Sequence, residues 1–308
     1  MARSGCGAAD ADLRDGCSLL EAPSPAKNMH NTIAVTVLVE NTARDRGLMG
    51  EHGLAYHIQA GEHTLLFDTG QTALVTQNAR RLGIDLSRLD ALALSHGHYD
   101  HTGGLHAVLE IARDAKLYAH PAACARRFAR NPDGTARDVG IGRENLDAIR
   151  AHPEGIHETT TATEVAQGVF LTGEIPRATD FEDVGGPFVL DQRGLDADPI
   201  VDDQALFFDT ADGVVVLLGC AHAGVVNTLR HIRQITGGRP IHTVLGGMHL
   251  LAAGPERMNR TVEALREEEV RRLGPAHCTG MAATARLWHE FPQACTVCAV
   301  GSRFTFER

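Results

Sequence analysis

Short runs of apolar, β-branched residues recur along the first part of the chain, separated by glycine-containing turns and amphipathic segments. Such runs predict strands, whereas apolar residues repeated every three or four positions predict helices. In this part we expect strands at residues 33–40, 53–59, 63–67, 89–94 and 116–119, and helices at residues 72–82 and 104–115.

The second part repeats this style after a charged, glycine-containing stretch at residues 126–153, which we interpret as a helix plus loop inserted between two halves. Strands are expected there at residues 168–172, 204–209, 214–218, 243–245 and 299–306, and helices at residues 222–235 and 256–273. Strand-rich blocks that alternate with helices predict an α/β protein. The long irregular segment at residues 178–202 is typical of a lid or binding loop, and equally of an ordinary surface excursion.

Residues 1–32 precede the first expected strand and contain acidic residues without a continuous apolar stretch. We expect a flexible N-terminal extension, not a signal peptide, followed by one domain over residues 33–308. The 308-residue chain has no run of about 18 apolar residues, so no membrane span is expected.

The formal net charge of −10 makes nucleic acid a poor partner, although a small phosphorylated substrate remains compatible with it. The seven cysteines are odd in number and irregularly spaced, which fits a reducing compartment, and we expect the cytoplasm. Cys295 and Cys298 are either two packed thiols or a redox or zinc pair. The sequence does not decide between a monomer and a homodimer.

Four residues with metal-binding side chains lie within six positions where an apolar strand is expected to end: His96, His98, Asp100 and His101. In extended backbone, residues two apart point the same way, so His96 and His98 can hold one cation. Asp100 and His101 lie where the chain is expected to turn into a helix, and they can reach a second cation. Zn²⁺ takes histidine and carboxylate ligands of this kind, and Mn²⁺ or Fe²⁺ also fits. The sequence therefore predicts a site for one or two metal ions.

This His-x-His-x-Asp-His string resembles the hallmark motif of the metallo-β-lactamase superfamily, and LLFDTG at residues 65–70 resembles the first motif of that superfamily. Further strings resemble a subgroup, the metal-dependent hydrolases similar to the archaeal 7,8-dihydropterin-6-methyl-4-(β-D-ribofuranosyl)aminobenzene 5'-phosphate synthase. They are VLVENT (37–42), EHGLAYHI (51–58), LSHGHYDHTGGL (94–105), TGEIPR (172–177), GCAHAGVVNTL (219–229), GGMHL (246–250) and HCTG (277–280). The resemblance implies a four-layer αββα sandwich over about residues 33–308, but it does not identify a substrate.

The resemblance also implies roles for single residues. Asp68 would order the metal loop by hydrogen bonding. His222 would be the third ligand of the first metal, and His277 the final ligand of the second. Where the superfamily usually has a bridging aspartate, this chain has Cys220, which either ligates or packs. A bridge by hydroxide alone, or a site dominated by one metal, therefore stays open.

Glu174 and Arg177 occupy the place where the superfamily's third motif normally provides a histidine. An arginine there suits a substrate phosphate or carboxylate, and a simple ion pair is the alternative. His249 in GGMHL is a substrate or outer contact, a ligand that replaces His277, or a structural cap. We therefore expect Glu174 and Arg177 to bind substrate and His249 to act near the metals.

The expected chemistry is hydrolysis, because bound metal lowers the pKa of water toward neutrality. Asp100 would orient this water as well as bind metal, and His249 could protonate a leaving group. We therefore expect a metal-dependent hydrolase that acts on a small, phosphorylated or ester-type substrate. The alternatives are a transferase resembling the pterin-condensing synthase, and a non-catalytic ligand sensor, against which the intact metal motif argues.

Overall fold

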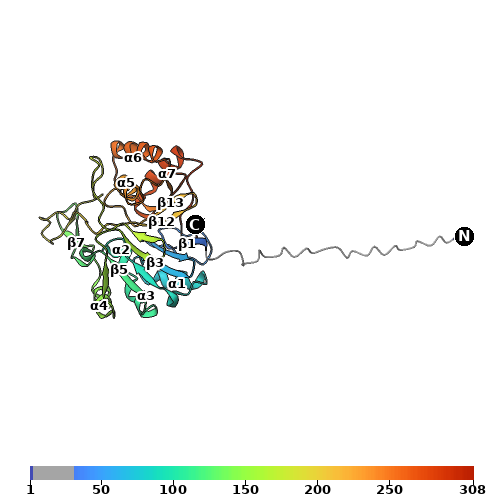
Figure 1. Cartoon of the computed structure of the whole chain (residues 1–308), viewed down its shortest axis with the longest axis horizontal. Helices are drawn as coiled ribbons and strands as arrows, with labels where there is room; N and C mark the ends of the chain where they lie inside the picture. Colours follow the sequence, from blue (N-terminus) through green and yellow to red (C-terminus); the bar gives the residue numbers. More distant parts are fainter. Residues whose placement is uncertain (3–30) are drawn as a thin grey trace.

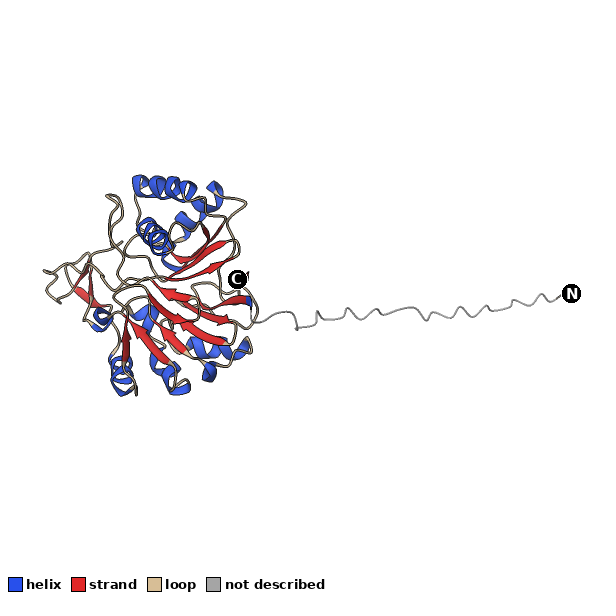
Figure 2. Ribbon diagram, viewed as in Figure 1, coloured by secondary structure: helices blue, strands red, loops and turns tan. Residues whose placement is uncertain are grey.

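The computed structural model describes residues 1–2 and 31–308. The expected N-terminal extension at residues 1–32 lies almost wholly outside these described residues. In the described part, two sheets face each other and helices cover their outer sides (Figures 1 and 2).

The first sheet has seven strands in the order β16-β1-β2-β3-β4-β5-β8. Neighbours from β16 to β3 are antiparallel, whereas β3, β4, β5 and β8 run parallel. The strands are β1 (Thr32–Val39), β2 (Ala55–Ala60), β3 (His63–Phe67), β4 (Ala91–Ala93), β5 (Lys116–Ala119), β8 (Ile156–Glu158) and β16 (Arg303–Glu307). The helices α1 (Leu74–Arg81), α3 (Leu105–Ile111) and α4 (Arg143–Ala151) flank it, and apolar side chains of all three contribute to one buried cluster with its outer face.

The second sheet has six strands in the order β15-β14-β13-β12-β10-β9. Its strands β13, β14 and β15 run parallel. The strands are β9 (Thr163–Ala166), β10 (Val169–Leu171), β12 (Leu206–Thr210), β13 (Gly213–Leu218), β14 (Ile241–Gly247) and β15 (Arg272–Ala276). The helices α5 (Val225–Ile235), α6 (Pro255–Glu267) and α7 (Met281–Glu290) lie on its outer side (Figure 1).

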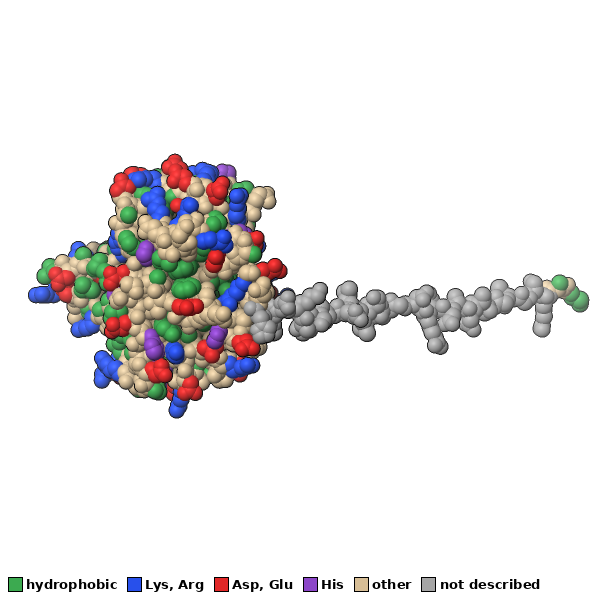
Figure 3. Space-filling model, in the orientation of Figure 1, with side chains coloured by type: hydrophobic (Ala, Val, Ile, Leu, Met, Phe, Trp, Pro, Cys, Tyr) green, Lys and Arg blue, Asp and Glu red, His purple; other side chains and the backbone are tan. Residues whose placement is uncertain are grey.

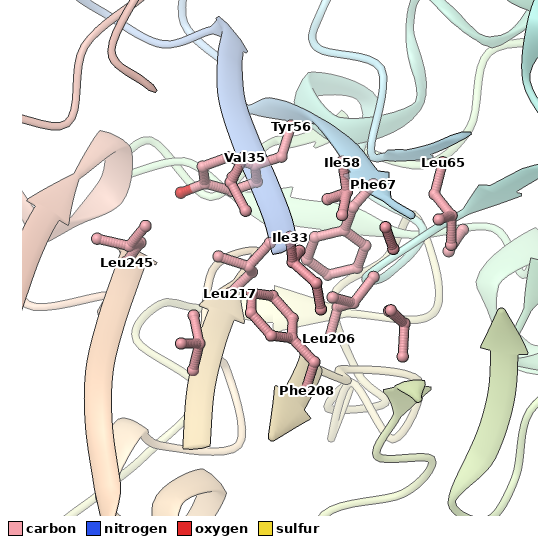
Figure 4. Close-up of a cluster of buried hydrophobic side chains, with 14 of the residues drawn as sticks. Ile33, Val35, Tyr56, Ile58, Leu65, Phe67, Leu206, Phe208, Leu217 and Leu245 are labelled. Atoms are coloured by element: carbon pink, nitrogen blue, oxygen red, sulfur yellow. The ribbon is translucent and has the colours of Figure 1, made fainter. Parts of the chain in front are cut away.

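The core between the sheets follows from the alternation of side chains along each strand. Ile33 and Val35 of β1 point inward and meet Leu206 and Phe208 of β12 in one buried cluster (Figure 4). Residues of opposite parity, such as Leu38, pack instead beneath the outer helices. The four-layer αββα sandwich implied by the motif resemblance is confirmed.

The interpretation of residues 126–153 as an inserted helix plus loop is wrong in part. This stretch also contains β6 (Phe128–Arg130) and β7 (Ala136–Asp138), which join β11 (Phe188–Val189) in a third, three-stranded sheet. The helix α4 then leads into β8, which extends the first sheet. Strands of two or three residues are too short to show an apolar alternation, and β11 is distant in sequence, so the pattern did not predict them.

Two helix boundaries also differ from expectation. The helix expected at residues 256–273 ends at Glu267, and a short turn leads into β15. The apolar spacing continues across that turn because Val270 and Leu273 pack into the same cluster as α6. The helix expected from residue 104 is preceded by the short α2 (Tyr99–Thr102), while α7 and β9 were not predicted.

The surface in view carries acidic and basic side chains interspersed, without a broad field of one sign (Figure 3). Among the described helices, none combines the length and the apolar composition that a bilayer crossing requires. The side chains that the sequence predicts to bind metal follow the carboxyl ends of central strands in both large sheets.

Candidate metal centre

The predicted metal-binding residues follow the ends of strands from both sheets. His96, His98, Asp100 and His101 lie between β4 and α3 in the first sheet. From the second sheet, Cys220 and His222 follow β13, His249 follows β14, and His277 follows β15. Because the carboxyl ends of parallel strands meet at one edge, residues up to 181 positions apart in the sequence, His96 and His277, converge there.

One group of nitrogen donors is formed by His96, His98 and His222. The Nε2 atom of His96 lies 3.0 Å from Nδ1 of His98. The ring centroid of His222 lies 4.8 Å from each of the other two. All three side chains are buried, and Nε2 of His222 has no hydrogen-bond partner in the part of the chain that the structure describes.

A second group is formed by Asp100, His101 and His277. Nε2 of His277 lies 3.2 Å from Oδ2 of Asp100 and 3.3 Å from Nε2 of His101. The Sγ atom of Cys220 lies 3.1 Å from the same His101 nitrogen. Cys220 also belongs to a potential ligand cluster with His96 and His222, so its sulfur is within reach of both groups.

The spacing of these atoms fits divalent metal. Four ligands held at the usual zinc distances in a tetrahedron lie about 3.3 Å apart, close to the separations of 3.0–3.3 Å found here. Buried polar atoms normally have partners, and the free Nε2 of His222 lacks one among the described residues. The donor set therefore fits a divalent cation in each group.

Hydrogen bonds to the outer nitrogens orient four of the imidazoles. Nδ1 of His222 donates to the Val184 carbonyl at 2.7 Å, and Nδ1 of His277 donates to Asn41 Oδ1 at 3.0 Å. Nδ1 of His96 lies 2.9 Å from Ser95 Oγ, and Nδ1 of His101 lies 2.7 Å from Asp68 Oδ2. Each bond can place a ring proton on the outer nitrogen, so that Nε2 faces the centre as the atom that would bind a metal.

Asp68 connects the bonds of His96 and His101 into one network through Ser95. Its fully buried carboxylate accepts from the Ser95 amide, the Ser95 hydroxyl and His101, each at 2.7 Å. Burial alone lowers the pKa of His101, but the carboxylates of Asp68 and Asp100 raise it to about 9. The network therefore holds a strongly basic imidazole against the centre.

The backbone around the site is strained. Asp68, Ala221, His249 and His277 all have positive φ angles, from 45° to 62°, although none is glycine. Such conformations cost about 1–3 kcal/mol each and persist where the surrounding structure enforces them. Their concentration beside the donor atoms fits a functional site.

Three supporting residues were not assigned from the sequence. Nε2 of His52 lies 3.1 Å from Oδ2 of Asp100, and its half-exposed ring stacks 4.7 Å from that of His277. Glu40 accepts from the His277 amide at 2.8 Å, next to the Asn41 contact. In the sequence these residues were marked only by their place in the VLVENT and EHGLAYHI strings. No local pattern could show their contacts, because Asp100 is 48 positions from His52 and His277 is 237 positions from Glu40.

The donor residues His98, Asp100, Cys220, His222 and His277 line a cavity of about 670 Å³. One wall comes from the three-stranded sheet region, with Phe188 and Arg137. The opposite rim consists of exposed apolar side chains, namely Leu251, Met281, Trp288 and Val297. This arrangement offers polar chemistry at the bottom and apolar contact along the sides.

Glu174 and Arg177 lie outside the lining of this cavity. Glu174 binds Nε2 of His120 at 3.1 Å. The Arg177 guanidinium donates to backbone carbonyls, including that of His222 at 2.6 Å. Their expected contact with substrate stays a prediction, and their present bonds position the irregular segment and His222.

His249 lines the cavity, and its ring centroid lies 4.2 Å from that of His222. Burial and the nearby Arg257 guanidinium lower its pKa to about 4. The imidazole is therefore neutral at pH 7, which makes it a weak proton donor. The expected role in protonating a leaving group stays a prediction.

The Cys295 and Cys298 thiols are free. Burial raises the pKa of Cys298 to about 12, and its sulfur lies 3.8 Å from the Tyr56 hydroxyl. Cys298 is packed in the core between the sheets, which favours the packing alternative for this residue.

Comparisons with known proteins agree with this geometry. The model of the metallo-beta-lactamase superfamily matches residues 49–230. The chain is 29% identical over 266 residues to a 7,8-dihydropterin-6-methyl-4-(beta-D-ribofuranosyl)-aminobenzene-5'-phosphate synthase of Methanocaldococcus jannaschii, covering 79% of this chain and 86% of the relative. An uncharacterized protein of the same organism is 29% identical over 256 residues, covering 82% and 93%.

A solved structure is similar over nearly the whole chain. Tm1679, described as a metal-dependent hydrolase of the beta-lactamase superfamily, has a TM-score of 0.75 and 28% sequence identity. The similarity covers 90% of this chain and all of Tm1679. The shared part therefore includes the strand ends that carry the donor residues.

Proposed function

Because the chain belongs to the metallo-beta-lactamase superfamily, we propose that it is a metal-dependent hydrolase of a small ester or phosphoester. The motif resemblance is confirmed by this membership, whereas the substrate is our proposal. The observation that carries the proposal is the convergence of two donor groups from both sheets at the floor of one open cavity.

We assign the ligands from the geometry of the donor atoms. His96, His98 and His222 would hold one cation, and Asp100, His101 and His277 would hold the other. Cys220 would lie between them, in place of a bridging carboxylate. Histidine, carboxylate and thiolate together suit zinc better than magnesium or calcium. When bound, zinc would supply a Lewis acid and lower the pKa of a water molecule.

The protein's own side chains would position the reactants. Nε2 of His52 lies 3.1 Å from Oδ2 of Asp100 and would hold the carboxylate in a fixed orientation beside the donor atoms. Phe188 and Trp288 would place an apolar part of the substrate along the walls. Holding the reacting groups in a fixed geometry lowers the entropic part of the barrier.

A second candidate function is a synthase. The relative from Methanocaldococcus jannaschii, with 29% identity over most of both chains, carries the name of a synthase. The apolar cavity walls suit aromatic substrates of that kind as well as those of a hydrolase. Synthase and hydrolase differ in whether a second substrate or water takes part in the reaction at the same centre.

The two candidates can be distinguished with zinc-loaded protein. It would be assayed with nitrophenyl phosphate, bis-nitrophenyl phosphate and nitrophenyl acetate, and in parallel for condensation of a pterin diphosphate with a ribofuranosylaminobenzene phosphate, in which diphosphate is the leaving group. The hydrolase proposal expects turnover of at least one ester, reduced about 10²–10³-fold in Asp100→Asn. The surface variant Glu263→Gln serves as the control. Condensation without any ester hydrolysis would replace this proposal with the synthase.

A further inference from the structure

A second cavity of about 390 Å³ lies beside the metal centre. On one side it is lined by the irregular segment, with Phe181, Asp183 and Gly185. On the other side it is lined by the start of α6, with Gly254 and Arg257. Neither the family motifs nor the proposed chemistry uses this cavity.

Arg257 is the unusual residue of this cavity. Its side chain is only 9% exposed, and its Nη1 atom pairs with Asp183. Its Nε and Nη2 atoms are buried and have no hydrogen-bond partner among the described residues. Unpaired polar atoms of a buried charged group are costly, so their retention indicates that a ligand satisfies them. The Nε–Nη2 edge of a guanidinium matches two oxygens of one oxyanion.

The start of α6 adds donors on the same side. This helix has 13 residues and begins after Gly254, which provides no side-chain cap. The comparable start of α5 is already satisfied, because the Glu182 carboxylate accepts from the amides of Val226 and Asn227 at 2.9 Å. Pro255 at the start of α6 has no N–H, so this end offers an anion the amides of Glu256 and Arg257 and the positive end of the helix dipole.

His249 separates this cavity from the metal centre by the thickness of one imidazole. It lines both cavities, and its ring centroid is 4.2 Å from that of His222. Its Nδ1 atom has no hydrogen-bond partner within residues 1–2 and 31–308. Gly185 packs directly on the ring, since a Cβ there would lie 2.0 Å from Nδ1. A ligand in the second cavity would therefore reach the edge of the catalytic cavity.

Two acidic groups near this cavity oppose anion binding and must be considered. The Asp183 side chain is 73% exposed, so water screens its charge, and it occupies only the Nη1 atom of Arg257. The Glu182 carboxylate is bonded to the α5 amides and to the Thr179 hydroxyl at 3.1 Å. Neither carboxylate is bonded to the Nε or Nη2 atom of Arg257.

We propose that this second cavity binds the phosphate group of a phosphomonoester substrate, as a handle remote from the bond that reacts at the metal centre. A phosphate suits the site better than a carboxylate, because its three terminal oxygens can use both the guanidinium edge and the α6 amides. The identification of the ligand as a substrate rests on the proposed function. The anion site itself can be tested without turnover.

The test is a calorimetric titration of zinc-loaded, full-length protein with inorganic phosphate. Arg257→Gln removes the guanidinium edge. Ala252→Glu, at an exposed residue lining the same cavity, supplies a competing carboxylate and leaves the Arg257–Asp183 pair intact. Arg266→Gln is the matched control, since it removes a paired arginine from the same helix away from the cavity. Circular dichroism and metal analysis accompany each variant.

We expect both cavity variants to weaken phosphate binding at least tenfold and the Arg266→Gln protein to bind as the wild type does. Wild-type phosphate affinity in both Ala252→Glu and a folded Arg257→Gln protein would overturn the inference. A wild-type protein that binds no phosphate would also overturn it. Arg257-dependent binding in a protein that hydrolyses no ester would support the site and reject the proposed hydrolase. Ester hydrolysis without Arg257-dependent binding would reject only the phosphate site.

Discussion

At the scale of single residues, Cys220 is the most informative side chain of the centre. From the sequence, Cys220 was expected either to bind metal or only to pack, at the place where the superfamily usually has a bridging aspartate. Burial raises the pKa of its thiol well above the usual range, with the Cys278 thiol contributing, so only a nearby cation would favour the thiolate. Its sulfur lies within reach of both donor groups. The geometry therefore favours the ligand alternative.

This role can be tested by spectroscopy. Protein loaded with Co²⁺ in place of zinc should show a near-ultraviolet thiolate-to-cobalt charge-transfer band, because a sulfur bound to Co²⁺ donates electron density to it. Cys220→Ser should lose the band, whereas Cys278→Ser, which alters the neighbouring buried thiol, should keep it. A band that persists in Cys220→Ser would show that the cysteine only packs.

His57, far from the metal ligands in sequence, predicts a pH dependence of stability. Burial on β2 and the nearby Arg303 lower its pKa from 6.5 to about 4. Between these values the unfolded chain binds a proton that the folded protein does not, so stability falls as pH drops from 6.5 toward 4. The loss from this one group is at most about 3 kcal/mol.

Urea unfolding at several pH values would measure this contribution. His57→Gln should flatten the profile between pH 6.5 and 4 relative to the wild type. His63→Gln, at a more exposed position on the adjacent strand, should leave the slope as it is. Equal slopes in wild type and His57→Gln would show that the residue is protonated in the folded state.

At the scale of elements, the irregular segment at residues 178–202 is tied to the second half of the fold. The side chain of Asn227 in α5 accepts from the amides of Ala178 and Thr179 at 2.9 Å. Val184 orients His222, and Phe188 lines the main cavity. Of the two alternatives drawn from the sequence, the contacts favour a binding loop.

Glu182 anchors this segment to α5, which gives a prediction about stability. Glu182→Ala would leave the amides of Val226 and Asn227 without their acceptor and should lower the free energy of unfolding by about 1–3 kcal/mol. Glu263→Ala, at an exposed position of α6, should change it by less than about 0.5 kcal/mol. Equal effects in denaturant titrations would contradict the capping role.

The sequence predicted features that depend on near neighbours. The strand leading to His96 and the alternation of Ile33 and Val35 are local patterns, and both elements were found close to the expected positions. The contact of His52 with Asp100 and the pairing of β11 with β6 join distant segments, so no local pattern marks them. The unpaired edge of Arg257 likewise becomes visible only once its surroundings are known.

At the scale of the whole molecule, the metal centre joins the two sheets. The first sheet supplies His96, His98, Asp100 and His101, and the second supplies His222 and His277. Bound cations would therefore connect two layers that otherwise meet through apolar side chains (Figure 4). A ligand that binds only the folded state stabilises it by an amount that grows with the logarithm of its concentration relative to its dissociation constant.

Metal removal should accordingly lower the thermal stability. At metal concentrations about a thousandfold above the dissociation constant, bound metal contributes about 4 kcal/mol, which for a chain of this length corresponds to a Tm decrease of about 6–7 °C on chelation. Differential scanning calorimetry with and without a chelator measures this decrease. His96→Ala should show a smaller decrease, and a wild-type Tm unchanged by the chelator would mean that metal does not join the sheets.

The most direct test of the account is anomalous X-ray diffraction at the zinc absorption edge from crystals of zinc-loaded protein. The account predicts two peaks at the strand ends. One should lie within bonding distance of His96, His98 and His222, and the other within bonding distance of Asp100, His101 and His277, with the Cys220 sulfur beside both. Zinc bound only elsewhere in the protein, or none at these side chains, would contradict it.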